Sequence, residues 1–295
     1  FLLFLYLLLE NKTQNHKLSF VTDPFEPGSI FKILTVASAL ENKIARYDTN
    51  YYCEQGKLRV EDHTIKEAEQ NKEYDWLSVA DIIKYSSNIG TTKIAFDLTY
   101  PKFEKTLIDF GIGKKSGVEL PGESRGIFTP SKNVSPLRLS NMSFGQGIAT
   151  TGIQMLSTYA IIANNGVYVR PTIIKDKRTE GKRVLSKEVS GELKQMLLEA
   201  VEYGTGKNAI IPHFQIAGKT STAQRPDKKG GYTGHVPGFI GFPVGMENNF
   251  VIYVYIDNPK ARNYYGNSIA APVFKKVAQY LIYRDKSFSK YAKNT

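Results

Sequence analysis

A serine and a lysine stand three residues apart at the start of a predicted helix, Ser29 and Lys32. Pro27 and Gly28 interrupt the preceding chain, and apolar residues then recur at helical spacing, which predicts a helix over 29–40. Residues three apart lie on one face of a helix, so we expect the two side chains to be neighbours. A lysine that is desolvated among apolar residues loses its proton more readily and can act as the base for a serine nucleophile. Backbone N–H groups at the helix N-terminus would lie beside the reacting centre.

The Ser-x-x-Lys spacing has little meaning by itself, because a chain of 295 residues is expected to contain it by chance. A second copy, Ser287 and Lys290, lies in a polar tail that no apolar helix follows. Further motifs therefore have to support the first pair.

Two other short motifs lie where secondary structure could bring them to Ser29. Ser86 and Asn88 fall between a predicted helix over 76–83, with Ser78 as its N-cap candidate, and another over 90–110. Lys219 lies in a predicted strand over 214–223, and an exposed strand edge can pair with an extended peptide through backbone hydrogen bonds. The three motifs together predict a cleft that accepts a peptide beside an activated serine.

Two matches to the same short patterns are expected to be surface loops. Ser131 and Asn133 repeat the Ser-x-Asn spacing, and residues 115–117 read Lys-Ser-Gly. Both matches lie in the stretch 114–135, which is rich in glycine and proline and is predicted to consist of turns. Neither has the helix or strand frame that the chemistry requires.

The motifs, in their order and spacing, identify the chain as similar to penicillin-binding proteins, whose signature combines S-x-x-K, S-x-N and a K-T-G strand. The sequence most resembles the transpeptidase domain of monofunctional, class B penicillin-binding proteins of the division or elongation type, over residues 15–283. The stretches that carry the resemblance are 23–32 (DPFEPGSIFK), 86–90 (SSNIG), 144–147 (FGQG), 218–224 (GKTSTAQ), 264–266 (YYG) and 270–274 (AAPVF).

The resemblance implies a D,D-transpeptidase that works on peptidoglycan stem peptides and is trapped by β-lactams. Ser29 would attack the penultimate D-alanine carbonyl, with Lys32 as base. Ser86 would relay a proton to the leaving amine, and Asn88 would hold Lys32 and the substrate amide.

The strand motif has implied roles of its own. Lys219 would direct positive potential at the terminal carboxylate, which the hydroxyls of Thr220 and Thr222 would bind. The backbone N–H groups of Ser29 and Thr222 would form the oxyanion hole. Ser221 stands where the family usually has glycine. If its side chain lies on the substrate face it would crowd bulky β-lactams, whereas if it points along the strand edge it would cost little.

The fold implied is α+β, of the penicillin-binding protein and serine β-lactamase type, with an antiparallel sheet flanked by helices and a mostly helical subdomain. Hydrophobic periodicity adds helices over 151–163, 190–202 and 270–283, short strands over 167–174 and 183–185, and a hairpin formed by 239–242 and 250–256. We expect an N-terminal remnant over 1–14, a transpeptidase domain over 15–285 with its helical subdomain at approximately 40–165, and a polar tail over 286–295.

Composition narrows the possible ligands. The net charge is +11, but the basic residues are dispersed and no nucleic-acid motif accompanies them, so no nucleic-acid partner is expected. Cys53 is the single cysteine, and the four histidines show no metal-ligand spacing. We therefore expect neither a metal nor a cofactor.

The first nine residues form an apolar run that is too short to span a bilayer. We interpret this run as a buried strand or as the end of a membrane helix. The resemblance implies a location on the outer, periplasmic face of the bacterial cytoplasmic membrane, although this chain carries no complete anchor. It also implies a membrane glycosyltransferase and division or elongation proteins as partners.

Three other functions are compatible with the sequence. The first is a β-lactamase or D,D-carboxypeptidase, in which water resolves the same acyl-enzyme, although no deacylating glutamate can be placed. The second is a truncated, non-catalytic domain that binds wall peptides or division partners, since only 28 residues precede Ser29. The third is nucleic-acid binding through the positive charge.

Overall fold

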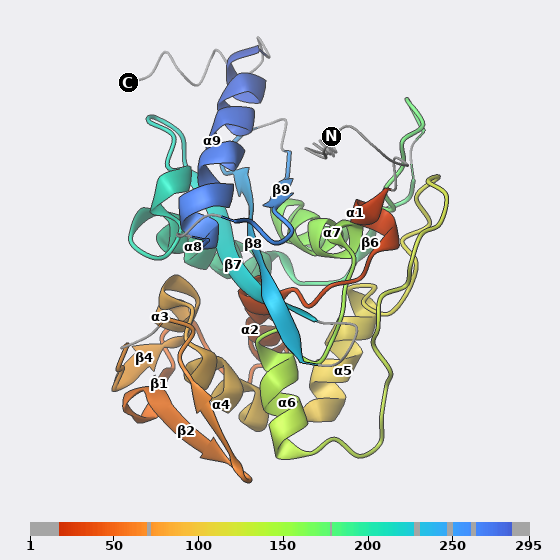
Figure 1. The fold of residues 1–295 in the computed structure, drawn as a ribbon. Helices are drawn as coiled ribbons and strands as arrows, with labels where there is room; N and C mark the ends of the chain where they lie inside the picture. Colours follow the sequence, from red (N-terminus) through yellow and green to blue (C-terminus); the bar gives the residue numbers. More distant parts are fainter. Residues whose placement is uncertain are drawn as a thin grey trace.

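An antiparallel sheet of three strands runs through the middle of the molecule in the order β7 (Ile216–Pro226), β8 (Tyr232–Pro243) and β9 (Ile252–Tyr255) (Figure 1). The predicted hairpin is confirmed, because β8 and β9 pair antiparallel with Ile240 opposite Tyr253. The computed structural model describes residues 18–69, 72–177, 179–226, 231–246, 250–260 and 264–284.

Alternation along the strands separates two hydrophobic cores, because successive side chains of a strand point to opposite faces of the sheet. One core lies under α9 (Gly266–Arg284). The strand residues of this core include Ile216, Phe239 and Ile252. The other core contains α2 (Lys32–Glu41) and parts of α7 (Gly152–Ala163) and α8 (Lys187–Glu202). The strand residues of this second core include Ala217, Ile240 and Tyr253. Helices thus cover both faces of the sheet, and the α+β class is confirmed.

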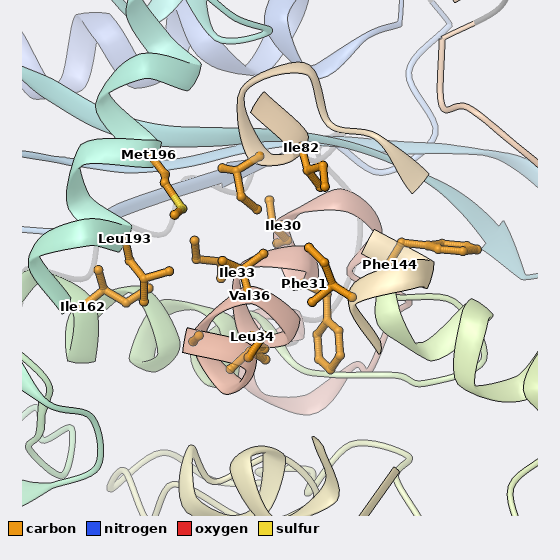
Figure 2. Packing of buried hydrophobic residues seen from close by; sticks show 14 of the residues in the cluster. Ile30, Phe31, Ile33, Leu34, Val36, Ile82, Phe144, Ile162, Leu193 and Met196 are labelled. Carbon is orange, nitrogen blue, oxygen red and sulfur yellow. The ribbon is translucent and has the colours of Figure 1, made fainter. Parts of the chain in front are cut away.

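The helix predicted from residue 29 is confirmed, with its first turn as the 3₁₀ helix η1 (Gly28–Phe31) that leads into α2. All of the side chains from Lys32 to Leu40 are buried. A helix that is apolar all round belongs in the interior. Figure 2 shows Ile33 and Val36 of this helix among residues of other helices, with Leu193 and Met196 of α8 on one side and Ile82 above. The nucleophile candidate Ser29 therefore lies directly before a helix whose side chains are almost all buried.

A second lobe lies below the sheet in Figure 1. It contains two small antiparallel ladders, in which β1 pairs with β4 and β2 pairs with β3. The strands are β1 (Asn50–Tyr52), β2 (Lys57–Val60), β3 (His63–Lys66) and β4 (Trp76–Ser78), with η2 (Glu54–Gly56) between β1 and β2. The helices are α3 (Val79–Tyr85), α4 (Asn88–Leu98), α5 (Tyr100–Asp109) and α6 (Pro136–Ser143).

Two sequence predictions in this lobe are wrong in detail. The segment 76–83 begins as strand β4, because Leu77 pairs with Tyr51. The helix starts only after Ser78, and the prediction of Ser78 as its N-cap is confirmed, because the Ser78 hydroxyl accepts from the Asp81 N–H at 3.1 Å. The segment 90–110 is two helices rather than one. Thr99 has a φ of 66° and breaks the helical path between them.

The helix α6 was not predicted at all. It begins at Pro136, whose fixed φ suits a first turn, and the Ser135 hydroxyl caps it by accepting from the Arg138 N–H at 3.2 Å. The Ser-Pro pair was the available signal, but the turn-rich stretch before it concealed the helix.

The helices α7, α8 and α9 agree with prediction to within about one turn. A capping box between Thr151 and Gln154 begins α7. Ser186 caps α8, which therefore starts one turn before the predicted position. The segments 167–174 and 183–185 contribute only β5 (Val167–Tyr168) and β6 (Lys182–Arg183). The short helices α1 (Ser19–Thr22) and η3 (Lys207–Ala209) complete the described structure.

The apolar run 1–9 and the pair Ser287 and Lys290 lie outside the described residues. Among the helices that are described, none combines the length and apolar character needed to cross a bilayer. The predicted division of the chain into a remnant, a transpeptidase domain with a helical subdomain and a tail stays a prediction.

Candidate active site

A cleft of about 770 Å³ opens between the sheet and the second lobe. Predicted site residues that line it are Ser29, Ser86, Asn88, Thr220, Ser221 and Thr222. Lys32 and Lys219 lie behind this lining, since their side chains are fully or almost fully buried. The structure therefore brings together segments that are up to about 190 residues apart in the sequence.

The amine of Lys32 is held by the Ser-x-Asn motif. Its Nζ donates to the Ser86 carbonyl oxygen at 2.5 Å and lies 3.2 Å from the Ser86 hydroxyl. Burial lowers the pKa of Lys32 well below its ordinary value, and the neighbouring Lys219 ammonium lowers it further, whereas the Glu67 carboxylate opposes both. Lys32 is thus a buried amine poised to accept a proton.

The turn that carries Ser86 has an unusual backbone. Ser86 has a φ of 63°, in the left-handed region that non-glycine residues rarely occupy, where it ends α3. Ser87 then caps α4 by accepting from the Gly90 N–H at 2.9 Å. This backward bend directs the Ser86 carbonyl and hydroxyl toward Lys32.

The side chain of Asn88 has a different partner from the one expected. We expected it to hold Lys32, but its Nδ2 donates to the Lys66 carbonyl oxygen at 2.8 Å. The backbone N–H of Asn88 donates to the Glu67 carboxylate at 2.7 Å. Asn88 therefore ties the turn to the end of strand β3, and Lys32 is held by Ser86.

The amine of Lys219 lies beside the hydroxyl of Thr205, which also contacts Thr220. Its Nζ is 3.5 Å from the Thr205 hydroxyl, and the Thr220 hydroxyl is 3.0 Å from the same oxygen. Burial lowers the pKa of Lys219 to about 7, with an opposing effect from Glu69. Near neutral pH, a small change of pH therefore alters the protonation of the Lys219 amine.

The Ser221 side chain does not stand in the cleft. It is 3% exposed, and its hydroxyl would lie 2.8 Å from a methyl group placed on Gly238, which is the residue paired with it on β8. Neither of the orientations considered from the sequence is correct. The hydroxyl is buried against the neighbouring strand, so it does not crowd the substrate face.

The Phe-Gly-Gln-Gly segment packs directly on the turn before Ser29. The Gly28 N–H donates to the Gly145 carbonyl at 3.1 Å, and a Cβ on Gly145 would lie 2.4 Å from the Gly28 carbonyl oxygen. The Gly147 N–H donates to the Glu26 carboxylate at 2.9 Å. Glycine at position 145 thus allows the backbone contact that fixes the start of η1.

The Tyr-Tyr-Gly segment forms the part of the cleft rim beside strand β7. Tyr264 stacks on His235 with ring centroids 4.0 Å apart, and Tyr265 lies next to it. The Gly266 N–H donates to the Thr222 hydroxyl at 3.2 Å, and a Cβ on Gly266 would collide with the Ser221 carbonyl oxygen. This close approach joins the rim to strand β7.

The two decoy motifs lie in loops, as expected, and neither lines the cleft. Ser131 donates to the Asn133 carbonyl at 2.9 Å, and Ser116 donates to the Glu123 carboxylate at 2.5 Å.

Thr205 and Glu67 are among the lining residues that the sequence motifs did not indicate. Thr205 lies in a Gly-Thr-Gly turn directly after α8, and this turn was the available signal. Glu67 follows β3 in a charged stretch that offered no motif.

Comparison with known proteins decides the family. The family model described as the penicillin-binding protein transpeptidase domain matches residues 7–279. The chain belongs to this family. Its motifs at Ser29, Ser86 and Lys219 therefore lie within a penicillin-binding protein transpeptidase domain.

The relatives include class B proteins. Stage V sporulation protein D of Bacillus subtilis is 32% identical over 268 residues, which cover 86% of this chain and 41% of that protein. The peptidoglycan D,D-transpeptidase FtsI of Escherichia coli is 31% identical and is matched over 86% of this chain and 43% of its own length. This chain thus spans less than half the length of each of these two relatives.

Solved structures of penicillin-binding proteins have the same fold as this chain. The transpeptidase domain of penicillin-binding protein 3 from Burkholderia pseudomallei superimposes with a TM-score of 0.83 at 29% identity, covering 90% of this chain and 81% of that one. Penicillin-binding protein 3 from Mycobacterium tuberculosis, in complex with ampicillin, gives a TM-score of 0.82 at 32% identity, covering 90% of this chain and 63% of that one.

Proposed function

We propose that this penicillin-binding protein is a peptidoglycan D,D-transpeptidase that forms an acyl-enzyme on Ser29. The observation that carries the proposal is the cleft, in which Ser29 lies one helical turn before a buried amine that contacts Ser86. A lowered lysine pKa beside a serine hydroxyl is the arrangement that activates a serine without a histidine.

In the first half of the reaction, Ser29 Oγ attacks the penultimate D-alanine carbonyl of a stem peptide and gives its proton to Lys32 Nζ. Ser86 passes a proton to the nitrogen of the terminal D-alanine as the C–N bond breaks, which leaves an ester on Ser29. The contact between Lys32 and the Ser86 hydroxyl provides the path for this proton.

In the second half, an amine of a neighbouring stem peptide attacks the ester carbonyl. Its nitrogen loses a proton to the Lys32 and Ser86 pair, the C–O bond breaks, and Ser29 regains its proton. One peptide bond has replaced another, so no external energy source or cofactor is required.

The strand β7 would bind the donor peptide. Lys219 supplies positive charge toward the terminal carboxylate, and the hydroxyls of Thr220 and Thr222 donate to it. The backbone N–H groups of Ser29 and Thr222 would stabilise the oxyanion, at about 3 kcal/mol per donor in other enzymes.

The cellular setting follows from the same proposal. The domain would act on the outer face of the cytoplasmic membrane, with a membrane glycosyltransferase and division or elongation proteins as partners. β-Lactams would acylate Ser29, and the ampicillin complex of the M. tuberculosis relative supports this expectation.

Intact-mass spectrometry after incubation with benzylpenicillin tests the proposal. We expect the mass of the protein to increase by one penicillin molecule for hours, and Ser29→Ala to remain unmodified. Rapid release of hydrolysed penicillin would instead indicate a β-lactamase. A folded wild-type protein that is never modified would indicate a non-catalytic binding domain.

A further inference from the structure

The turn from Ser86 to Asn88 has an acidic partner that the mechanism above does not use. Glu67 follows strand β3 directly, and its two carboxylate oxygens accept from different residues of the turn. Oε1 accepts from the Ser87 hydroxyl at 2.6 Å, and Oε2 accepts from the Asn88 N–H at 2.7 Å. One side chain thus bridges the second and third residues of the Ser-x-Asn motif.

These bonds extend into the start of α4. The Ser87 hydroxyl donates to Glu67 and accepts from the Gly90 N–H at 2.9 Å, so both of its hydrogen-bonding functions are used. A carboxylate is also favoured at a helix N-terminus because of the positive end of the helix dipole. The neighbouring residue Lys66 adds its carbonyl oxygen as the acceptor for the Asn88 side chain. The end of β3 therefore holds the turn at three points.

The position of this turn sets the position of the catalytic amine. Within the described part of the chain, the Lys32 amine makes its two hydrogen-bonding contacts with Ser86, the residue directly before Ser87. Ser86 has the strained φ of 63°, which persists only where neighbouring structure fixes it. A turn released from Glu67 would carry both acceptors away from Lys32.

We propose that Glu67 is a positioning residue, which holds the Ser86–Asn88 turn so that the Ser86 carbonyl and hydroxyl meet the Lys32 amine. The inference rests on the proposed function, because it assigns Glu67 a part in acylation of Ser29. The Glu67 charge has a second effect, since it raises the pKa of Lys32 against the lowering by burial and by Lys219.

The opposing interpretation is that Glu67 only caps α4. In that case its removal would lower the unfolding temperature and leave the acylation rate of the folded protein unchanged. The two interpretations differ in the rate, the pH profile and the effect of a conservative replacement.

The experiment measures the rate of acylation by benzylpenicillin across pH in Glu67→Gln and Glu67→Asp, with Glu61→Gln as the matched control. Glutamine keeps the size of the side chain but has one acceptor oxygen in place of two and no charge. Glu61 lies in the exposed turn of the same hairpin, away from the cleft.

We expect Glu67→Gln to acylate roughly 10-fold to 100-fold more slowly, because small displacements of a reacting group have effects of this size. Glu67→Asp should recover part of the rate, and Glu61→Gln should match the wild type. The groups that face Lys32 are Lys219 from β7, whose own charge is influenced by Glu69, and Glu67. Among the described residues, Glu67 is the acidic group that faces Lys32 directly, and Glu67→Gln removes its charge. The pKa of Lys32 should therefore fall, and the acidic limb of the rate profile should move to lower pH.

A wild-type rate and profile in folded Glu67→Gln would overturn the proposal. Hydrogen exchange at the Asn88 amide provides a readout that does not depend on acylation. If the wild type is never acylated, the proposed function fails, whereas unchanged Asn88 exchange in Glu67→Gln overturns the positioning role by itself. Faster exchange confined to the turn, together with slower acylation, supports it.

Discussion

One wall of the cleft is the strand β7, and the opposite wall is the turn from Ser86 to Asn88. The strand is held by a continuous antiparallel ladder with β8, from Ile216 opposite Pro243 to Gln224 opposite His235, and by apolar side chains on both faces of the sheet. The turn is held by a few polar contacts to Glu67, Lys66 and Lys32.

Because the two walls are held differently, one should be sensitive to a change of charge and the other to a change of position. A ladder keeps its shape when one side chain changes, so the sensitive property of the strand wall is the buried charge of Lys219. The turn depends on its polar side-chain contacts as well as on backbone hydrogen bonds to the end of α3, so its sensitive property is position. Substitutions on the two walls should therefore differ in how they affect rate and stability.

The largest effect is expected for Lys219→Met, which keeps the length of the side chain and removes its charge. Acylation by benzylpenicillin should fall on the order of 10³-fold, because a preorganised charge at a reacting centre contributes this much. The ladder should survive, so the protein should remain folded. Lys207→Met, at an exposed position in η3, serves as the control and should acylate normally.

The same variant should change how stability depends on pH. The pKa of Lys219 is about 7 in the folded protein and ordinary, near 10.5, in the unfolded chain. Between these values the unfolded chain binds more protons, so the free energy of unfolding should rise with pH, by up to about 1.4 kcal/mol per pH unit from this group. Chemical denaturation between about pH 7.5 and 9.5 should show a smaller slope in Lys219→Met, and an unchanged slope would contradict the buried charge.

An intermediate effect is expected for Asn88→Ala on the turn wall. Loss of the hydrogen bond to the Lys66 carbonyl should lower the free energy of unfolding by about 1 kcal/mol. Acylation should slow roughly 10-fold to 100-fold as the turn shifts. Asn133→Ala in the exposed decoy motif is the matched control. If Asn88→Ala altered neither quantity, the contrast between the walls would be lost.

The smallest effect is expected for Ser221→Gly, which restores the residue usual in the family. Because the hydroxyl is buried against Gly238, acylation by small and by bulky β-lactams should stay within about twofold of the wild type. The free energy of unfolding should fall by roughly 0.5–1 kcal/mol, because glycine is costly within a strand. A selective gain with bulky β-lactams would show that Ser221 does crowd the cleft.

The sequence was sufficient for those parts of the molecule that have strong local signals. The helix from residue 29, the strand through Lys219 and the final hairpin each have hydrophobic periodicity, and the family motifs named part of the cleft lining, including Ser29, Ser86 and Asn88. Where these signals were weak, the prediction was wrong. The segment 76–83 becomes a strand at first only because Tyr51 pairs with Leu77, and such a non-local contact leaves no periodic signal.

The polar partners of the motif residues could not be predicted from the sequence either, because these contacts are also non-local. Glu67 and Asn88 are 21 residues apart, and their contact depends on the path of the β2–β3 hairpin. The orientation of Ser221 was also undetermined, because a strand with an ambiguous register leaves open which face a side chain occupies.

The buried amine of Lys219 has a consequence for any anion that enters the cleft. Burial lowers the pKa of this side chain to about 7, so it gains and loses its proton near neutral pH. An anion beside it favours the protonated form, so binding draws protons from the buffer and release returns them. Affinity for such an anion would weaken as the solution becomes alkaline, although the ligand itself does not titrate.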